Sequence, residues 1–152
     1  MKVSELMNPR VVTVGPKTPL RKIMQLMLQH HLNDILVVDS EQRLAGIVTY
    51  SDLSRKLLPT QKELIEHEEY LTTPALMADR FRDITGVAVE EIMRRDVITV
   101  PPDFEALKAG ATMTARRVKQ LPVVQDEKVI GIISHADIGW GLMMQYAEDV
   151  RG

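Results

Sequence analysis

The chain has 152 residues, of which 45% are apolar and 26% charged, and its formal net charge is -2. This length fits one ordinary domain or two small ones, and the near balance of charge provides no basic field of the kind that binds nucleic-acid backbones. The absence of cysteine excludes disulfides, thiolate metal sites and cysteine nucleophiles. No apolar run approaches the about 20 residues of a membrane span, and the N-terminus lacks a secretory signal, so we expect a cytoplasmic protein.

The sequence contains two copies of one unit, related by a shift of 86 residues. The matches keep their order along the chain, with the loss of one residue in the second copy. A period of this length is too long for a solenoid and indicates two small related domains. The matching segments are residues 5–7 and 91–93, 11–16 and 97–102, 37–38 and 123–124, and 46–52 and 131–137.

The first copy predicts a strand, a helix, two strands and a helix, in the order βαββα. Residues 11–14 form a β-branched run, and Thr18 followed by Pro19 predicts an N-cap and a first helical residue. The strands are expected at residues 35–39 and 44–48, and the last helix opens around Ser51. The connection between the first two strands is long enough for a parallel crossover. The apolar stripe expected along the first helix comprises Leu20, Ile23, Met24, Met27 and Leu28.

The segment between the copies has its own helix signals. Thr60 and Glu63 have the spacing of a capping box, and Thr73-Pro74 resembles another helix start, so we expect two short helices between about residues 60 and 83. Four glutamates surround His67, which is more typical of a solvated acidic face than of a metal site. In the second copy, the predicted helix carries Ala106, Ala109 and Gly110, which indicates either close helix contact or sequence drift.

Polar residues end the last strand of each copy. Thr49 precedes Asp52 by three residues, and Ser134 precedes Asp137 in the same way. Hydroxyls and free helix amides can donate to phosphate oxygens, while a carboxylate can accept from both hydroxyls of a ribose. The same residues, with Ser51, could instead cap the helix that follows. The repetition of the pattern makes a nucleotide site a real alternative to a cap.

These motifs resemble a tandem pair of cystathionine-β-synthase (CBS) domains, the regulatory arrangement called a Bateman module. The resemblance rests on residues 6–7 and 92–93, on the two Thr-Val-x-Pro stretches, and on the two Gly-hydrophobic-x-Thr/Ser-x-x-Asp motifs. It implies an α/β (α+β) fold of two pseudo-two-fold-related βαββα units packed through their sheets, with a short helical insertion. The implied boundaries are 1–58 for the first CBS domain, 59–86 for the insertion, 87–145 for the second domain and 146–152 for a tail.

The resemblance also implies which residues bind a ligand. It places Asp52 and Asp137 on ribose hydroxyls, and Thr49, Ser51 and Ser134 on phosphates. Lys119, just before a strand of the second copy, would reach the phosphate at the aspartate of the first copy. Ala136 stands where Ser51 stands in the first copy, and Asp34 would oppose phosphate at the other cleft. We therefore expect two unequal clefts.

The resulting hypothesis is a regulatory sensor that binds an adenine nucleotide, AMP or ATP, in a cleft between the repeats and modulates a partner protein in trans. The resemblance further implies a homodimer. The alternative is a dimerisation or docking module with no small-molecule role. No catalytic motif, metal site or required cofactor is indicated, so we expect neither an enzyme nor a protein that binds nucleic acid or inserts into a membrane.

Overall fold

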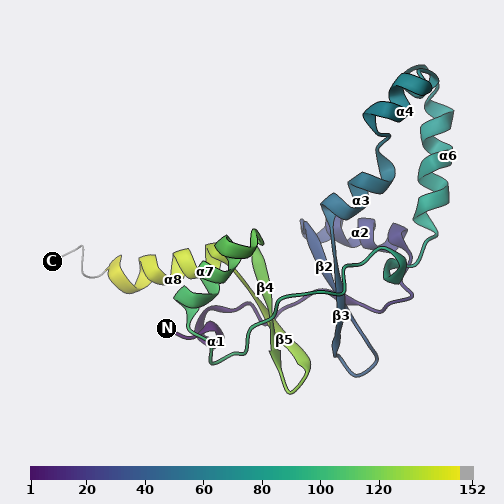
Figure 1. Ribbon diagram of the computed structural model, residues 1–152. Helices are drawn as coiled ribbons and strands as arrows, with labels where there is room; N and C mark the ends of the chain where they lie inside the picture. Colours follow the sequence, from purple (N-terminus) through teal and green to yellow (C-terminus); the bar gives the residue numbers. More distant parts are fainter. Residues whose placement is uncertain (148–152) are drawn as a thin grey trace. The chain divides into compact units, whose positions relative to one another are not determined.

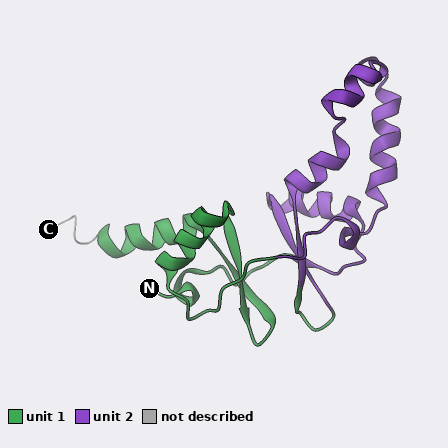
Figure 2. Cartoon of the chain, in the orientation of Figure 1, with its two compact units in different colours: residues 1–12, 40–44, 97–152 green, residues 13–39, 45–96 purple. Residues whose placement is uncertain are grey.

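The computed structural model describes residues 1–147, and residues 148–152 lie outside this description. The chain forms two compact units, each built from stretches that are distant in sequence (Figure 2). Unit 1 comprises residues 1–12, 40–44 and 97–152, and unit 2 comprises residues 13–39 and 45–96. Of the predicted tail, residues 146 and 147 continue the last helix and the others fall outside the described residues.

Unit 2 contains the three-stranded sheet of the first copy (Figure 1). Its strands are β1 (Thr13–Val14), β2 (Asp34–Val38) and β3 (Leu44–Thr49), in the order β1-β2-β3. β1 and β2 are parallel, as predicted, and helix α2 (Leu20–His30) makes the crossover between them. Helix α3 (Tyr50–Leu57) follows β3 directly. The βαββα order is therefore confirmed, although the first strand is two residues shorter than expected.

The start of α2 differs from the prediction. Thr18 is not the N-cap, because the helix begins at Leu20 and Pro19 is the extended cap residue, with ψ 148°. The cause is pairing with a distant segment: Leu20 N donates to Val87 O, and Val89 N donates to Thr18 O. These bonds hold residues 18–20 extended, so the helix cannot begin before Leu20.

The core of unit 2 lies between α2, the sheet and a segment that enters from the end of the insertion. Leu20, Ile23 and Met27 of the predicted stripe are buried, and Met24 packs partly against them. Leu28 is 79% exposed, so its predicted burial was wrong; it lies at the edge of the stripe, in the last turn of the helix. Val89, in the 3₁₀ helix η1 (Val89–Glu91), is fully buried in the same core.

Unit 1 repeats this arrangement around the second copy. It contains helix α7 (Ala106–Arg116), antiparallel strands β4 (Gln120–Gln125) and β5 (Lys128–Ser134), and helix α8 (His135–Ala147). A single parallel bridge between Val100 and Val123 replaces the β1–β2 pairing of unit 2. Helix α1 (Val3–Leu6), from the start of the chain, completes the core with Val3 fully buried.

The segment between the copies forms three helices, and not the two that we predicted: α4 (Gln61–Glu66), α5 (Glu69–Thr72) and α6 (Pro74–Thr85). The capping box at Thr60 is present, with the Glu63 carboxylate accepting from Thr60 N at 2.7 Å. Arg80 joins α6 to the preceding helices by donating to Lys56 O, Leu58 O and Glu63 Oε1. The Thr60 amide, followed by Arg80, holds the pKa of Glu63 below its usual range.

The small residues of α7 face the core of unit 1. Ala106 and Ala109 are fully buried, and a Cβ added to Gly110 would meet Ile138 Cδ1 of α8 at 3.5 Å. That distance is an ordinary van der Waals contact, so the helix packing does not require glycine there. Within residues 1–147, none of the helices combines the length and the hydrophobicity of a transmembrane span.

Candidate functional site

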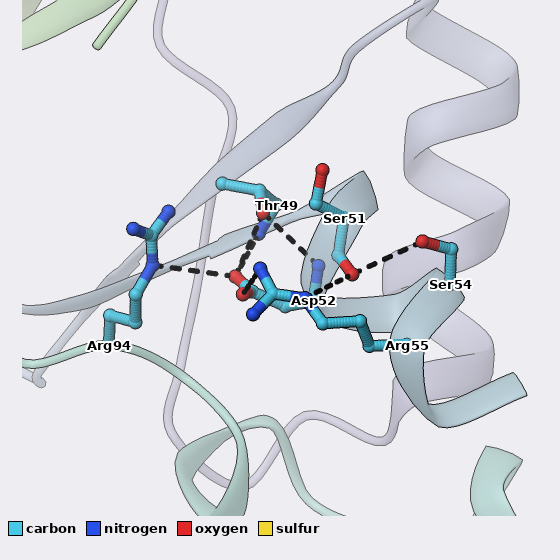
Figure 3. A network of polar contacts seen from close by, with 6 residues as sticks. All are labelled: Thr49, Ser51, Asp52, Ser54, Arg55 and Arg94. Atoms are coloured by element: carbon cyan, nitrogen blue, oxygen red, sulfur yellow. Dashed lines mark hydrogen bonds and ion pairs between the residues drawn. The ribbon is translucent and has the colours of Figure 1, made fainter. Parts of the chain in front are cut away.

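Thr49 and Asp52 form a compact polar box where β3 meets α3 (Figure 3). The Thr49 amide and hydroxyl both donate to Asp52 Oδ2, each at 2.9 Å, and the Thr49 hydroxyl accepts from Asp52 N at 3.3 Å. The Asp52 side chain is only 10% exposed. The helix cap that the sequence allowed is therefore present, and it uses one oxygen of the carboxylate.

Ser134 and Asp137 form the same box in unit 1, where β5 meets α8. Asp137 Oδ2 accepts from the Ser134 amide at 2.8 Å and from its hydroxyl at 2.7 Å, and Asp137 N donates to Ser134 Oγ at 3.2 Å. In the described part of the chain, no hydrogen bond reaches the other oxygen of either carboxylate. Each box thus leaves Oδ1 of its aspartate able to accept a hydrogen bond from a ligand.

The loop before the second strand of each copy joins its box through the backbone. Tyr50 N donates to Asn33 O at 2.7 Å, and the equivalent His135 N donates to Lys119 O at 3.3 Å. Lys119 is exposed, and its main chain lies beside the first residue of α8. Because Lys119 belongs to unit 1 and Asp52 to unit 2, their action on one ligand stays a prediction.

Ser51 does not take part in the cap. Thr49 is the N-cap of α3, whereas Ser51 is exposed and uses its carbonyl to accept from Ser54 Oγ and Arg55 Nε. The Ser51 hydroxyl points away from the carboxylate in Figure 3. Ala136, which occupies the matching position of α8, is also exposed. The difference between these residues therefore changes an exposed surface and leaves the two capping boxes alike.

Two arginines flank Asp52, and neither of them was predicted as a site residue from the sequence. Arg94 Nε lies 3.7 Å from Oδ2, and Arg55 Nη2 lies 3.5 Å from Oδ1 (Figure 3). A signal for Arg94 exists in the repeat itself, because the shift of 86 aligns it with Asn8. One copy therefore carries a cation where the other carries a neutral amide.

The backbone of Arg94 is fixed against β3. Arg94 and Ile47 exchange two hydrogen bonds, each 2.9 Å long, and Met93 packs over Gly46. In unit 1, Asn8 and Ile132 exchange the equivalent pair of hydrogen bonds, and Met7 packs over Gly131. The glycine of each motif leaves room for this crossing segment, which brings residue 94 to the Thr49–Asp52 box and pairs residue 8 with β5.

The other candidate clusters have ordinary structural roles. His30 ends α2, and His31 is its C-cap, with φ 53°; Arg117 has the same role and conformation after α7. His67 Nδ1 lies 3.2 Å from Glu69 Oε1. In the region from residue 1 to residue 147, no group of three or more carboxylate or imidazole side chains gathers as a metal site would require.

The duplicated sheet and paired boxes agree with the comparison to known families. The pattern described as CBS domain matches residues 3–59 and 89–138, which is well over half of the chain. The chain belongs to the CBS domain family. The two matched segments make it a tandem pair of CBS domains, so the resemblance found in the sequence and the mixed α/β fold class are both confirmed.

Relatives and solved structures support this membership. A chloride channel protein, CLC-f of Arabidopsis thaliana, is 32% identical over 134 residues, which cover 86% of this chain and 16% of the channel. The chain thus spans about a sixth of that relative. The CBS domain of a membrane protein from Sphaerobacter thermophilus has a TM-score of 0.73 at 25% identity, covering 92% of this chain and 86% of that one.

A third similar protein comes from Methanocaldococcus jannaschii and was described as a candidate archaeal homologue of g-AMPK. Its structure has a TM-score of 0.75 at 29% identity, and the match covers 93% of this chain and 47% of that one. Segments similar to this chain therefore occur in proteins of quite different lengths. In each comparison, the similarity covers at least 86% of this chain.

Proposed function

We propose that this tandem CBS pair is a regulatory sensor of adenine nucleotides, and that it modulates a partner protein in trans. The observation that carries the proposal is the pair of boxes, Thr49 with Asp52 and Ser134 with Asp137. In each box, the cap occupies Oδ2 of the aspartate and leaves Oδ1 without a hydrogen bond among the described residues. Capping and ribose recognition are therefore compatible roles of one carboxylate.

The two boxes differ in charge, which supports preferential binding of an anionic ligand at Asp52. That carboxylate has two guanidiniums within 4 Å, whereas the residues that align with these arginines in the other copy are Asn8 and Trp140, which carry no charge. Nucleotide phosphates are anionic at neutral pH, so the box of unit 2 has the more favourable electrostatic environment. We propose adenine as the base because the resemblance to tandem CBS domains, the family to which the chain belongs, implies an adenosyl ligand.

Ser51, Ser134 and Lys119 belong to the proposal as further ligand contacts. The exposed Ser51 hydroxyl is available to phosphate, whereas the Ser134 hydroxyl already donates to Asp137. Lys119 is exposed and bears a charge of the right sign. We propose AMP or ATP as a regulatory ligand that binds reversibly, with no cofactor required.

Isothermal titration calorimetry with AMP, ADP and ATP tests this function. We expect binding by the native protein and at least a tenfold weaker affinity for Asp52→Asn, because the amide replaces one carboxylate oxygen by a donor and removes the charge. Asp137→Asn is the matched control in the other copy and should have the smaller effect. Failure of the native protein to bind any of the three nucleotides at millimolar concentration would refute the proposal.

A docking module without a small-molecule role is favoured by one feature, the exposed apolar face of α8. Trp140 is 66% exposed and Met144 is 76% exposed, and with Met143 they follow the spacing of one helix face. We propose a second copy of this chain as the occupant of that face, which is the homodimer implied by the resemblance. Light scattering of Trp140→Glu tests it, since the native protein should be dimeric and the variant monomeric, whereas Asp52→Asn should leave the dimer intact.

A further inference from the structure

We infer that Arg94 is the residue that recognises phosphate at the Thr49–Asp52 box, and that it gives this site its preference for a nucleotide over the uncharged nucleoside. The inference rests on the proposed function, since it names a binding residue of the same site. It is independent of Lys119, because Arg94 and Asp52 both belong to unit 2.

The backbone on both sides of this contact is held in place. Arg94 is tied to β3 by the two hydrogen bonds with Ile47, and Asp52 is held in the first turn of α3 by its bonds with Thr49. The backbone of Arg94 is therefore held within reach of the box, although its side chain is 57% exposed. A cation on a fixed backbone loses less conformational freedom on binding than one on a mobile loop.

The guanidinium of Arg94 has capacity left for a ligand. Only its Nε approaches Asp52, at 3.7 Å, which is longer than a normal hydrogen bond. The two terminal nitrogens point away from the carboxylate in Figure 3 and contact no other residue drawn there. Because the guanidinium is largely exposed and lies beyond hydrogen-bond distance of Asp52, its contact with the carboxylate contributes little stability, and its partial exchange for a phosphate costs little. The terminal nitrogens also have the planar arrangement that suits two phosphate oxygens.

The comparison of the two copies isolates this residue. The cap geometry is the same in both boxes, and the backbone pairing of residue 94 with β3 matches that of residue 8 with β5. What differs at this position is the side chain, which is a guanidinium in unit 2 and a primary amide in unit 1. Arg55 adds a second cation to the box of unit 2, but it is folded over α3, with Nε donating to Ser51 O. Arg94 is therefore the better placed of the two for an incoming anion.

The test compares AMP with adenosine in the native protein, in Arg94→Gln and in the matched control Arg95→Gln. Arg95 is also exposed, and its substitution by glutamine removes the same charge. Its Nη2 donates to Glu90 O, however, and it has no contact with Asp52. We expect Arg94→Gln to weaken the affinity for AMP by about tenfold, as for loss of a charged hydrogen bond. The affinity for adenosine should stay within twofold of the native value. Arg95→Gln should leave both affinities within twofold, and the salt dependence of AMP binding should decrease only in Arg94→Gln.

The outcomes separate this inference from the proposed function. Suppose that the native protein binds AMP, and that Arg94→Gln reduces the affinities for AMP and adenosine equally or reduces neither. The role of Arg94 is then refuted and the sensor function stands. If Arg95→Gln reduces AMP binding as much as Arg94→Gln, the effect is one of general charge, and the inference is also refuted. If the native protein binds neither compound, the proposed function itself is refuted, and the role of Arg94 with it.

Discussion

At the scale of single residues, the glycine of each motif determines how closely the crossing segment approaches the box. A Cβ added to Gly46 would lie 2.7 Å from Met93 Sδ and 2.8 Å from Arg94 O, and a Cβ added to Gly131 would lie 2.7 Å from Met7 Sδ. A thioether can move, but the Arg94 carbonyl is fixed by its hydrogen bond from Ile47 N. The requirement for glycine is therefore steric and is not a matter of unusual φ, which is positive at no glycine of the described chain.

Gly46→Ala should destabilise unit 2 by about 1–3 kcal/mol, the range for overpacking a close contact. It should also displace Arg94 and so weaken nucleotide binding. Gly110→Ala is the control: its added Cβ meets Ile138 at an ordinary 3.5 Å, so it should be neutral or stabilise α7 by up to about 1 kcal/mol. Urea denaturation of both variants measures the difference, and equal stability of the two would contradict the steric argument.

At the scale of elements, the insertion of unit 2 is held by one short polar network. Glu63 accepts from the Thr60 amide at the start of α4 and from Arg80 of α6, and Arg80 also donates to two carbonyls at the end of α3. The same helix α3 begins at the Thr49–Asp52 box. The insertion is thus connected through one eight-residue helix to the proposed ligand site.

The Glu63 network predicts that the insertion loosens in acid. The pKa of Glu63 is lowered on folding, first by the Thr60 amide and then by Arg80, so its contribution to stability is present above the unfolded pKa of about 4.3 and is lost as pH falls through the folded value. Hydrogen exchange of residues 61–85 should therefore accelerate between pH 5 and pH 3, after correction for intrinsic rates. Glu63→Gln should weaken this pH dependence, whereas Glu66→Gln, on the same helix, should retain it.

At the scale of the whole molecule, the first residues of each copy complete the core of the other copy. Val3 is buried with α7, β4 and β5 in unit 1, and Val89 is buried with α2, β2 and β3 in unit 2. The shift of 86 relates these two valines. The domain boundaries 1–58 and 87–145 describe the sequence repeats and stay a prediction. In the compact units, the first segment of each repeat packs with the rest of the other repeat.

This exchange predicts a crossed effect of two equivalent substitutions. Val3→Ala should destabilise unit 1 by about 1–3 kcal/mol, since it removes two buried methyl groups and leaves a cavity. Hydrogen exchange should then accelerate in α7, β4 and β5 and not in α2 or β2, although α2 is nearer in sequence. Val89→Ala should have the opposite pattern. The exchange would be contradicted if hydrogen exchange accelerated only in the repeat that follows the substituted valine in sequence. That repeat contains α2 and β2 for Val3, and α7, β4 and β5 for Val89.

Much of the fold could be predicted because its signals are local or repeated. The crossover, the hairpins and the capping box at Thr60 follow from β-branched runs, turn residues and cap spacing. The duplication strengthened the prediction, because the same patterns occur in both copies. The prediction failed at Thr18 because pairing with residues 87–89 overrides a local cap signal. It failed in the insertion because α5 has only four residues, too few for a periodic pattern.

The candidate site was predictable only in part for the same reason. Thr49, Asp52, Ser134 and Asp137 could be found because each hydroxyl and its carboxylate are three residues apart in the sequence, and a capping box has that spacing. Arg94 lies more than 40 residues from Asp52, and no local pattern connects them. Their approach depends on the antiparallel pairing of Arg94 with Ile47, which is a tertiary contact.

The sequence by itself determined the duplication, the βαββα order and the two capping boxes, since these depend on interactions between residues that are close in the chain or on a repeated pattern. Only the tertiary structure decided which segments share a core, that Val3 belongs with the second copy, and that two arginines flank Asp52. The physical reason is that burial and electrostatic contacts depend on distance in space. The fold places residue 3 in a core formed by the second copy, and it pairs residue 94 with a strand of the first copy.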